Sequence, residues 1–277
     1  MKKLLIRTLS GTAYCILVVF AIYSSQWLGS RMAGSCVFIA FFGFVAMMGV
    51  HECYKNLTIK GVETNKAAGY TLALLTYCLI SIMGIAHMAF LSMLILPALF
   101  AVVFLCQLWR KDEHPFATIG YTLLPIIWVV YPLVLMQPLS NFGAGLLMMV
   151  FICTWINDSG AYLTGMAIGK HKMWERHSPN KTWEGTLGGA LFCVLGAIFI
   201  GPLLQGGLSW WYWAILGLTC SVAGTLGDLV ESMFKRFCGV KDSGNIMPGH
   251  GGVLDRFDSV IMIIPFILFI LCVGSLF

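Results

Sequence analysis

Charged residues are scarce in this chain, because Asp, Glu, Lys and Arg together make up only 10% of its 277 residues. Hydrophobic residues account for 59%, and the mean hydropathy is +0.87. This balance excludes an ordinary soluble globular protein and indicates an integral membrane protein. The chain has ten cysteines but no Cys-x-x-Cys pair, and they are scattered mostly through apolar segments. Neither a disulfide framework nor a zinc site is therefore indicated.

Long uncharged stretches predict the number of membrane spans. A helix needs about 20 residues to cross the hydrocarbon core of a bilayer, and each uncharged stretch of this chain fits one or two such helices. The stretches do not alternate in polarity as the strands of a membrane barrel do. We therefore predict an all-α polytopic membrane protein with about nine transmembrane helices. They lie near residues 9–27, 32–50, 67–86, 89–108, 117–136, 143–164, 185–204, 208–227 and 257–276.

The basic residues predict how these helices are oriented. If the N-terminus is cytoplasmic, all of the 17 Lys and Arg residues except Arg31 fall in cytoplasmic segments. Cytoplasmic loops carry an excess of Lys and Arg, so this asymmetry predicts a cytoplasmic N-terminus and a C-terminus outside. Any chemistry would then face the cytoplasm, and the net charge of +5 would favour contact with anionic membrane lipids. Nucleic acid is not an expected partner, because the basic residues are spread over several short loops.

The acidic residues divide the chain unevenly, since most of the 12 lie in its second half. We predict an N-terminal transmembrane scaffold, residues 1–142, that contains the first five spans. Residues 143–277 would form a C-terminal catalytic region with the last four spans and two cytoplasmic loops, 165–184 and 228–258. In this topology several of the last four spans present their acids and bases at the cytoplasmic side, where a polar site could form.

Two pairs of carboxylates lie at the start and the end of the second loop. Asp228 and Glu231 are three residues apart, and Asp255 and Asp258 repeat this spacing, which places each pair on one helix face. Mg²⁺ prefers oxygen ligands and is usually held by one or two carboxylates together with substrate phosphates. We interpret these four residues as ligands of one or two Mg²⁺ ions. The alternative is ordinary charge at a membrane boundary, paired with nearby Lys or Arg.

The segment between the two pairs is suited to bind phosphate. Residues 248–252 read Pro-Gly-His-Gly-Gly before the last span, and the N–H groups of Gly251 and Gly252 could cradle phosphate oxygens. His250 is a candidate for phosphate binding or proton transfer. The candidate cations are Lys235, Arg236, Lys241 and Arg256. The alternatives are that the glycines only permit a tight turn and that the cations only anchor the spans.

Two features upstream extend the candidate site. Asp158 lies inside a predicted span, where a charge is costly and usually functional, unless it pairs with a buried Lys or Arg. The segment 178–185 reads Ser-Pro-Asn-Lys-Thr-Trp-Glu-Gly, which predicts a turn with Thr182 as the N-cap of the next helix. Lys181 in this turn could reach the same anion. We expect His51, Glu52, His87 and the methionines to be structural.

These residues resemble the signature of the phosphatidate cytidylyltransferases, also called CDP-diacylglycerol synthases. The signature contains a Ser, a Lys-Arg pair, a Lys-Asp pair, Pro-x-His-Gly-Gly and a closing Asp-Arg-x-Asp. It is met here by Ser232, Lys235-Arg236, Lys241-Asp242, Pro248, His250-Gly251-Gly252, Asp255-Arg256 and Asp258. Asp158 and the segment 178–185 are also similar to features of this family.

The resemblance implies an Mg²⁺-dependent transfer of a cytidylyl group from CTP to phosphatidate, giving CDP-diacylglycerol and pyrophosphate for phospholipid biosynthesis. It also implies a homodimer in the inner membrane. Asp228 and Asp255 would be the leading metal ligands, with Glu231 and Asp258 beside them. The implied catalytic residues are Asp158, Lys181, Asp228, Glu231, Lys241, Asp242, His250, Asp255, Arg256 and Asp258. The implied substrate-binding residues are Ser178, Lys181, Lys235, Arg236, Lys241, Gly251, Gly252 and Arg256.

Two other functions fit parts of the same pattern. A CTP-dependent kinase of a polyprenol or other lipid alcohol would use similar acids and bases. It would need a base such as Asp158 or His250, because its substrate is a neutral hydroxyl. An ion transporter could use the intramembrane carboxylates, although no internal repeat of the kind common in transporters is found.

Overall fold

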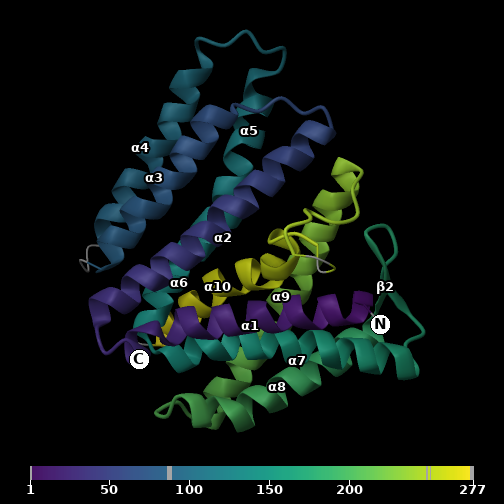
Figure 1. Cartoon of the computed structure of the whole chain (residues 1–277). Coiled ribbons are helices and arrows are strands. Elements are labelled where there is room, and N and C mark those ends of the chain that lie inside the picture. The colour runs from purple at the N-terminus through teal and green to yellow at the C-terminus, as the bar shows by residue number, and fades with distance from the viewer. Residues whose placement is uncertain (1, 86–88, 248, 250, 275–277) are drawn as a thin grey trace. The chain divides into compact units, whose positions relative to one another are not determined.

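The computed structural model describes residues 2–85, 89–247, 249 and 251–274. The described chain is almost entirely helical, which confirms the predicted all-α class (Figure 1). Its elements in order are α1 (Lys2–Trp27), α2 (Arg31–Ile59), α3 (Lys66–Ile85), α4 (Ala89–Gln107), α5 (Pro115–Pro125), the π-helical segment η1 (Ile126–Val130), α6 (Tyr131–Asn141), α7 (Ala144–Ile168), β1 (Lys172–Trp174), β2 (Ser178–Thr182), α8 (Trp183–Leu204), α9 (Trp210–Cys238) and α10 (Leu254–Gly274).

Eight helical segments within the described residues are long and apolar enough to cross a membrane. One of them, Pro115–Asn141, combines α5, η1 and α6 into a single continuous span. The remaining predicted span corresponds to α4, of which the part Leu96–Gln107 is a shorter apolar helix. The multi-span architecture is thus confirmed, while the orientation of the two ends of the chain stays a prediction.

The chain folds as two compact units. The first comprises Met1–Gln137 and Phe237–Arg256, and the second comprises Pro138–Arg236 and Phe257–Phe277. The segment Phe237–Arg256, which carries much of the sequence signature, therefore packs with the first five spans. The predicted division into a scaffold and a catalytic region stays a prediction, because compact units are defined by packing and not by activity.

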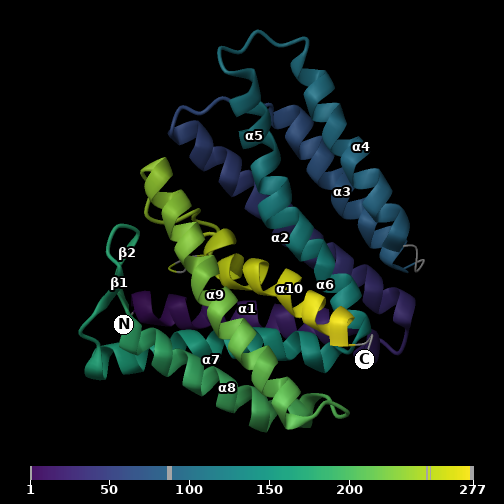
Figure 2. The same cartoon turned by 180° about the vertical axis from the view of Figure 1, so that it is seen from behind.

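Hydrogen bonds between helices help to hold the first unit together. Such bonds matter in a membrane, because the hydrophobic effect does not drive helices together in lipid. In this unit α3 and α4 lie side by side (Figure 1, Figure 2). The fully buried Tyr54 of α2 donates its hydroxyl proton to the carbonyl oxygen of Thr122 in α5, at 2.6 Å. Ser24 of α1 donates to the carbonyl oxygen of Gly34 in α2, at 2.9 Å. These bonds tie α1, α2 and α5 to one another.

In the second unit α7 and α8 lie side by side along most of their length (Figure 1, Figure 2). Their backbones can approach because α8 presents Gly189, where a Cβ atom would lie 2.7 Å from the carbonyl oxygen of Asn157 in α7. The side chain of Asn157 accepts a hydrogen bond of 2.6 Å from the hydroxyl of Ser221 in α9. This bond joins α9 to α7 next to Asp158 of α7 and two turns before Asp228 of α9.

A short hairpin that was not predicted connects α7 and α8. Its strands pair antiparallel, with Lys172 opposite Thr182 and Trp174 opposite Ser178. The predicted N-cap of α8 is confirmed, because the Thr182 hydroxyl accepts a hydrogen bond of 3.2 Å from the Gly185 N–H. The hairpin thereby sets Lys181 one residue ahead of the N-cap of α8 and close to α9.

Candidate active site

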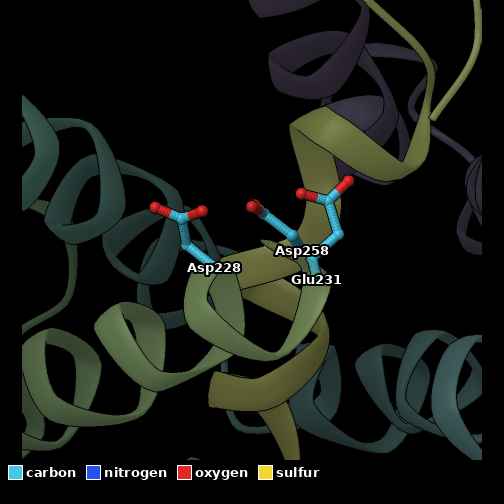
Figure 3. A group of neighbouring side chains, drawn as sticks. All are labelled: Asp228, Glu231 and Asp258. Atoms are coloured by element: carbon cyan, nitrogen blue, oxygen red, sulfur yellow. The ribbon is translucent and has the colours of Figure 1, made fainter. Parts of the chain in front are cut away.

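Three carboxylates converge where α9 and α10 meet. Asp228 and Glu231 project from neighbouring turns of α9, and Asp258 of α10 lies between them (Figure 3). Oxygen atoms of the three side chains all lie within 4.8 Å of one another. The helices can come this close because α9 has Gly227, where a Cβ atom would lie 2.7 Å from the carbonyl oxygen of Asp258. The structure thus brings together three of the four predicted metal ligands.

Two lysines neutralise part of this negative charge. The Lys181 ammonium lies 2.6 Å from an oxygen of Asp228, and the Lys235 ammonium lies 2.5 Å from an oxygen of Glu231. Lys235 is one turn after Glu231 on α9, whereas Lys181 reaches across from the hairpin and also donates to the carbonyl oxygen of Thr225. Pairing with Lys was the alternative to a metal site. Here, however, the pairs occur where three acids converge, and charges that only mark the membrane boundary would have no reason to converge.

A cavity of about 470 Å³ opens beside Asp228. It is lined by α7, β2, α8 and α9, and its charged lining residues are Asp158, Lys181 and Asp228. Asp158 lies within α7, inside a candidate membrane span as predicted, and its side chain is exposed. The cavity falls within the range of about 300–1,000 Å³ typical of small-molecule sites. It could therefore admit part of a substrate directly beside the carboxylates.

The fourth predicted ligand, Asp255, belongs to the first unit and organises the loop before α10. One of its oxygens accepts hydrogen bonds from the Gly252 N–H at 2.7 Å, the Ser243 N–H at 2.9 Å and the Ser243 hydroxyl at 2.8 Å. The Gly252 N–H, predicted to bind phosphate, is thus directed to a carboxylate. A metal-ligand role for Asp255 stays a prediction.

The other predicted residues are spread over both units. Lys241 and Asp242 are exposed in the first unit, and Gly251 there pairs with Met247 in an isolated bridge. His250 lies outside the described residues, as does Pro248 of the signature. Ser178 is half-buried in β2, and Arg236 is exposed in the last turn of α9. Arg256 lies in the first turn of α10, and its carbonyl oxygen accepts a hydrogen bond of 3.3 Å from the Tyr14 hydroxyl.

Sequence reasoning missed two residues of α2. Glu52, expected to lie near the end of a span, is only 1% exposed. It contacts Ser243, Val253 and Leu254 in and after the loop that joins α9 to α10. Asn56, one turn later, donates to the carbonyl oxygen of Ser243 at 3.0 Å. The sequence did contain a signal for them. If the helix continues past residue 51, Glu52 and Asn56 lie one turn apart on the same face, and a helix face that packs against other segments buries its polar side chains.

The sequence profile of the cytidylyltransferase family matches residues 5–273, which is nearly the whole chain. The chain belongs to the cytidylyltransferase family. This confirms the resemblance seen in the motifs between Asp158 and Asp258. The profile also covers the first five predicted spans, which carry none of those motifs.

Curated relatives from bacteria agree with this assignment. The chain is 39% identical over 183 residues to a phosphatidate cytidylyltransferase of Bacillus subtilis (strain 168), covering 64% of this chain and 68% of that protein. It is 35% identical over 269 residues to a phosphatidate cytidylyltransferase of Staphylococcus aureus (strain COL), covering 94% and 96%. The second match includes Glu52 and the carboxylate cluster in one continuous similarity.

Proposed function

We propose that this protein transfers a cytidylyl group from CTP to phosphatidate, releasing pyrophosphate and forming CDP-diacylglycerol for phospholipid biosynthesis. The observation that carries the proposal is the cluster of Asp228, Glu231 and Asp258 beside a cavity with Lys181, in a chain of the cytidylyltransferase family. Similarity to proteins named phosphatidate cytidylyltransferase over 94% of the chain supports this choice of substrates.

The carboxylate cluster fits Mg²⁺. All three side chains offer oxygen atoms, the ligands that Mg²⁺ prefers, and they lie within 4.8 Å of one another. When bound, the ion would supply positive charge that offsets the negative charge of the substrate phosphates. Asp228, Glu231 and Asp258 would hold it, and Asp255 is a further proposed ligand. One or two ions are compatible with this set of residues.

The reaction requires positioning and charge stabilisation more than a strong base. A phosphate oxygen of phosphatidate, already ionised near neutral pH, forms a bond to the α-phosphorus of CTP. The bond from that phosphorus to the oxygen bridging the α- and β-phosphates breaks, and pyrophosphate leaves with that oxygen. Repulsion between two anionic substrates opposes this step, so cations aimed at the phosphates are the groups that accelerate it.

The lysines of the site are suited to that task. Lys181 and Lys235 already lie against carboxylates, so each ammonium is held at the site before a substrate arrives. Bound phosphates would compete with the carboxylates for these ammonium groups. We propose the same role for Arg236, Lys241 and Arg256, whose guanidinium and ammonium groups suit phosphate. Ser178, Gly251 and Gly252 are proposed to bind phosphate oxygens, and Asp158, Asp242 and His250 to complete the catalytic set.

We propose that the site faces the cytoplasm from the inner membrane, where CTP is available. The predicted cytoplasmic segments contain every Lys and Arg except Arg31, which supports this orientation. We further propose that the protein is a homodimer, that residues 143–277 form its catalytic region, and that it does not bind nucleic acid.

Labelled CTP tests this function against the two alternatives. Purified protein is incubated with phosphatidate, Mg²⁺ and CTP labelled at either the α- or the γ-phosphate, and the lipid fraction is counted. Label in the lipid from α-labelled CTP alone is the expected result. Label from γ-labelled CTP with a lipid alcohol would instead indicate a kinase, and ion flux in proteoliposomes without CTP turnover would indicate a transporter. Either of these results would overturn the proposal.

A further inference from the structure

A buried carboxylate of α2 caps the start of α10 from a distant part of the chain. The Glu52 carboxylate accepts a hydrogen bond of 2.9 Å from the Val253 N–H and one of 2.8 Å from the Leu254 N–H. The first N–H groups of a helix have no partner within the helix, and the helix dipole makes that end positive. Glu52 satisfies these donors with a negative charge, although about 200 residues separate the partners in sequence.

The loop before α10 is shaped to admit this carboxylate. A Cβ atom on Gly244 would lie 2.2 Å from an oxygen of Glu52, and one on Gly252 would lie 2.5 Å from the same oxygen. Both positions therefore require glycine while Glu52 occupies its place. Asn56, one turn further along α2, donates to the carbonyl oxygen of Ser243 at 3.0 Å. Glu52 and Asn56 thus hold the loop at Ser243 and at its junction with α10.

Ser243 connects this anchor to Asp255. Its hydroxyl lies 3.0 Å from an oxygen of Glu52 and 2.8 Å from an oxygen of Asp255, while its N–H donates to Asp255 at 2.9 Å. A hydroxyl has a single proton, so it donates to one carboxylate at a time. The position of Asp255 consequently depends on where Glu52 holds Ser243.

We propose that Glu52 and Asn56 are positioning residues for cytidylyl transfer. They hold Ser243, Val253 and Leu254 in place so that Asp255 and Arg256 meet the substrates in a reactive geometry. The inference rests on the proposed function, in which those two residues belong to the catalytic set. It assigns to the predicted scaffold half of the chain a direct part in building the site.

Substitution of Glu52 by Gln tests the anchor. An amide keeps the size of the side chain but has one acceptor oxygen, so its NH₂ group would face a backbone N–H or the Ser243 hydroxyl. We expect kcat to fall about 10- to 100-fold, because a displacement of about 1 Å costs this much in well-positioned sites. The KM for CTP should rise as well, since Gly252 and Arg256, which are proposed to bind phosphate, lie beside the residues that Glu52 anchors. Glu52→Asp, which keeps both acceptor oxygens, should recover part of the loss.

Glu63→Gln is the matched control, because Glu63 is an exposed glutamate in the loop that follows α2. It should match the parent protein in kcat, KM and thermal unfolding. A Glu52→Gln variant with parental kcat would overturn the proposal. So would a fall in activity that is accounted for entirely by less folded protein, measured by size-exclusion chromatography and thermal unfolding.

Ser243→Ala supplies a second route, because it leaves both backbone hydrogen bonds to Glu52 intact. We expect it to lower kcat about tenfold, and parental activity would reject the connection through Ser243. Hydrogen exchange at Val253 and Leu254 tests the anchor independently of turnover. These amides should exchange faster in Glu52→Gln than in the parent protein, and unchanged exchange would overturn the anchor. A parent protein that forms no CDP-diacylglycerol would instead reject the proposed function alone.

Discussion

At the scale of single residues, the proposed chemistry depends on the mutual repulsion of Asp228, Glu231 and Asp258. Two like charges about 4 Å apart repel by about 4 kcal/mol at an effective dielectric constant of 20. Holding three ionised carboxylates within 4.8 Å of one another therefore requires nearby positive charge. Lys181 and Lys235 supply part of it at 2.6 and 2.5 Å. A divalent cation would supply more, which supports the proposed Mg²⁺ site.

Replacing Asp228 by Asn removes one of these charges without changing the size of the side chain. We expect turnover to fall at least about 100-fold, the scale seen when one group that stabilises the transition-state charge is removed. The concentration of Mg²⁺ needed for half-maximal activity should rise in any residual activity. Both effects are measured with α-labelled CTP in a titration of Mg²⁺, and Asp255→Asn is expected to behave in the same way.

Glu113→Gln is a suitable control for these variants, because Glu113 is exposed in the loop between α4 and α5. It should retain parental activity and the parental response to Mg²⁺. Near-normal turnover in both Asp228→Asn and Asp255→Asn would reject the proposed ligand roles. Each variant must also reach the membrane in parental amounts, which immunoblotting of the membrane fraction measures.

At the scale of secondary structure, the crossing of α9 and α10 creates the acidic cluster. Glycine permits this crossing at two successive turns of α9. A Cβ atom on Gly227 would lie 2.7 Å from the carbonyl oxygen of Asp258, and one on Gly224 would lie 3.1 Å from the side chain of Ile263. Small residues at such crossings allow membrane helices to pack closely. The distance between acids on different helices is therefore set by residues that carry no charge.

Replacing Gly227 by Ala should separate the two helices, because its methyl group would overlap a backbone oxygen that cannot move alone. We expect activity to fall about 10- to 100-fold through displacement of Asp258, while the protein still inserts in the membrane. Gly120→Ala is the matched control, since nothing lies within 4 Å of a Cβ atom at that helical position. A Gly227→Ala variant as active as Gly120→Ala would show that the spacing of α9 and α10 does not limit the reaction.

The helices themselves were predictable, because hydropathy is a local property of the sequence. Their ends were less so. The predicted spans stopped near residues 50 and 227, whereas α2 continues to Ile59 and α9 continues to Cys238. Lys and Glu are good helix formers, and each helix ends just before a glycine with positive φ, Gly61 at 79° and Gly239 at 75°. Such glycines are helix stop signals that indicate the observed ends better than charge does.

The site was predictable in its residue types but not in its arrangement. Asp228, Glu231 and Asp258 were recognised because two pairs of acids with this spacing occur within 31 residues beside a predicted span. The role of Glu52 depends on a contact across about 200 residues, which no local pattern contains. The hairpin of β1 and β2 was missed for a related reason, since strands of three and five residues with little apolar alternation give a weak signal.

At the scale of the whole molecule, orientation in the membrane decides whether the proposed reaction is possible, because CTP is a cytoplasmic nucleotide and does not cross a bilayer unaided. The charge distribution predicts that the hairpin between α7 and α8 is cytoplasmic and that the turn between α8 and α9 is outside. An inverted orientation would leave the carboxylate cluster without its nucleotide. The same protein would then fit a transporter better than a transferase.

Cysteine labelling in spheroplasts tests this orientation. Gly206 lies in the turn after α8, where nothing is within 4 Å of a Cβ atom, and Glu175 is exposed in the hairpin, so both accept cysteine without a packing change. A membrane-impermeant maleimide should label Gly206→Cys in intact spheroplasts, and Glu175→Cys only after permeabilisation. The parent protein, with its ten cysteines, sets the background. The reverse pattern would place the hairpin outside, where Lys181 and Asp228 could not meet cytoplasmic CTP, and the proposed function would have to be abandoned.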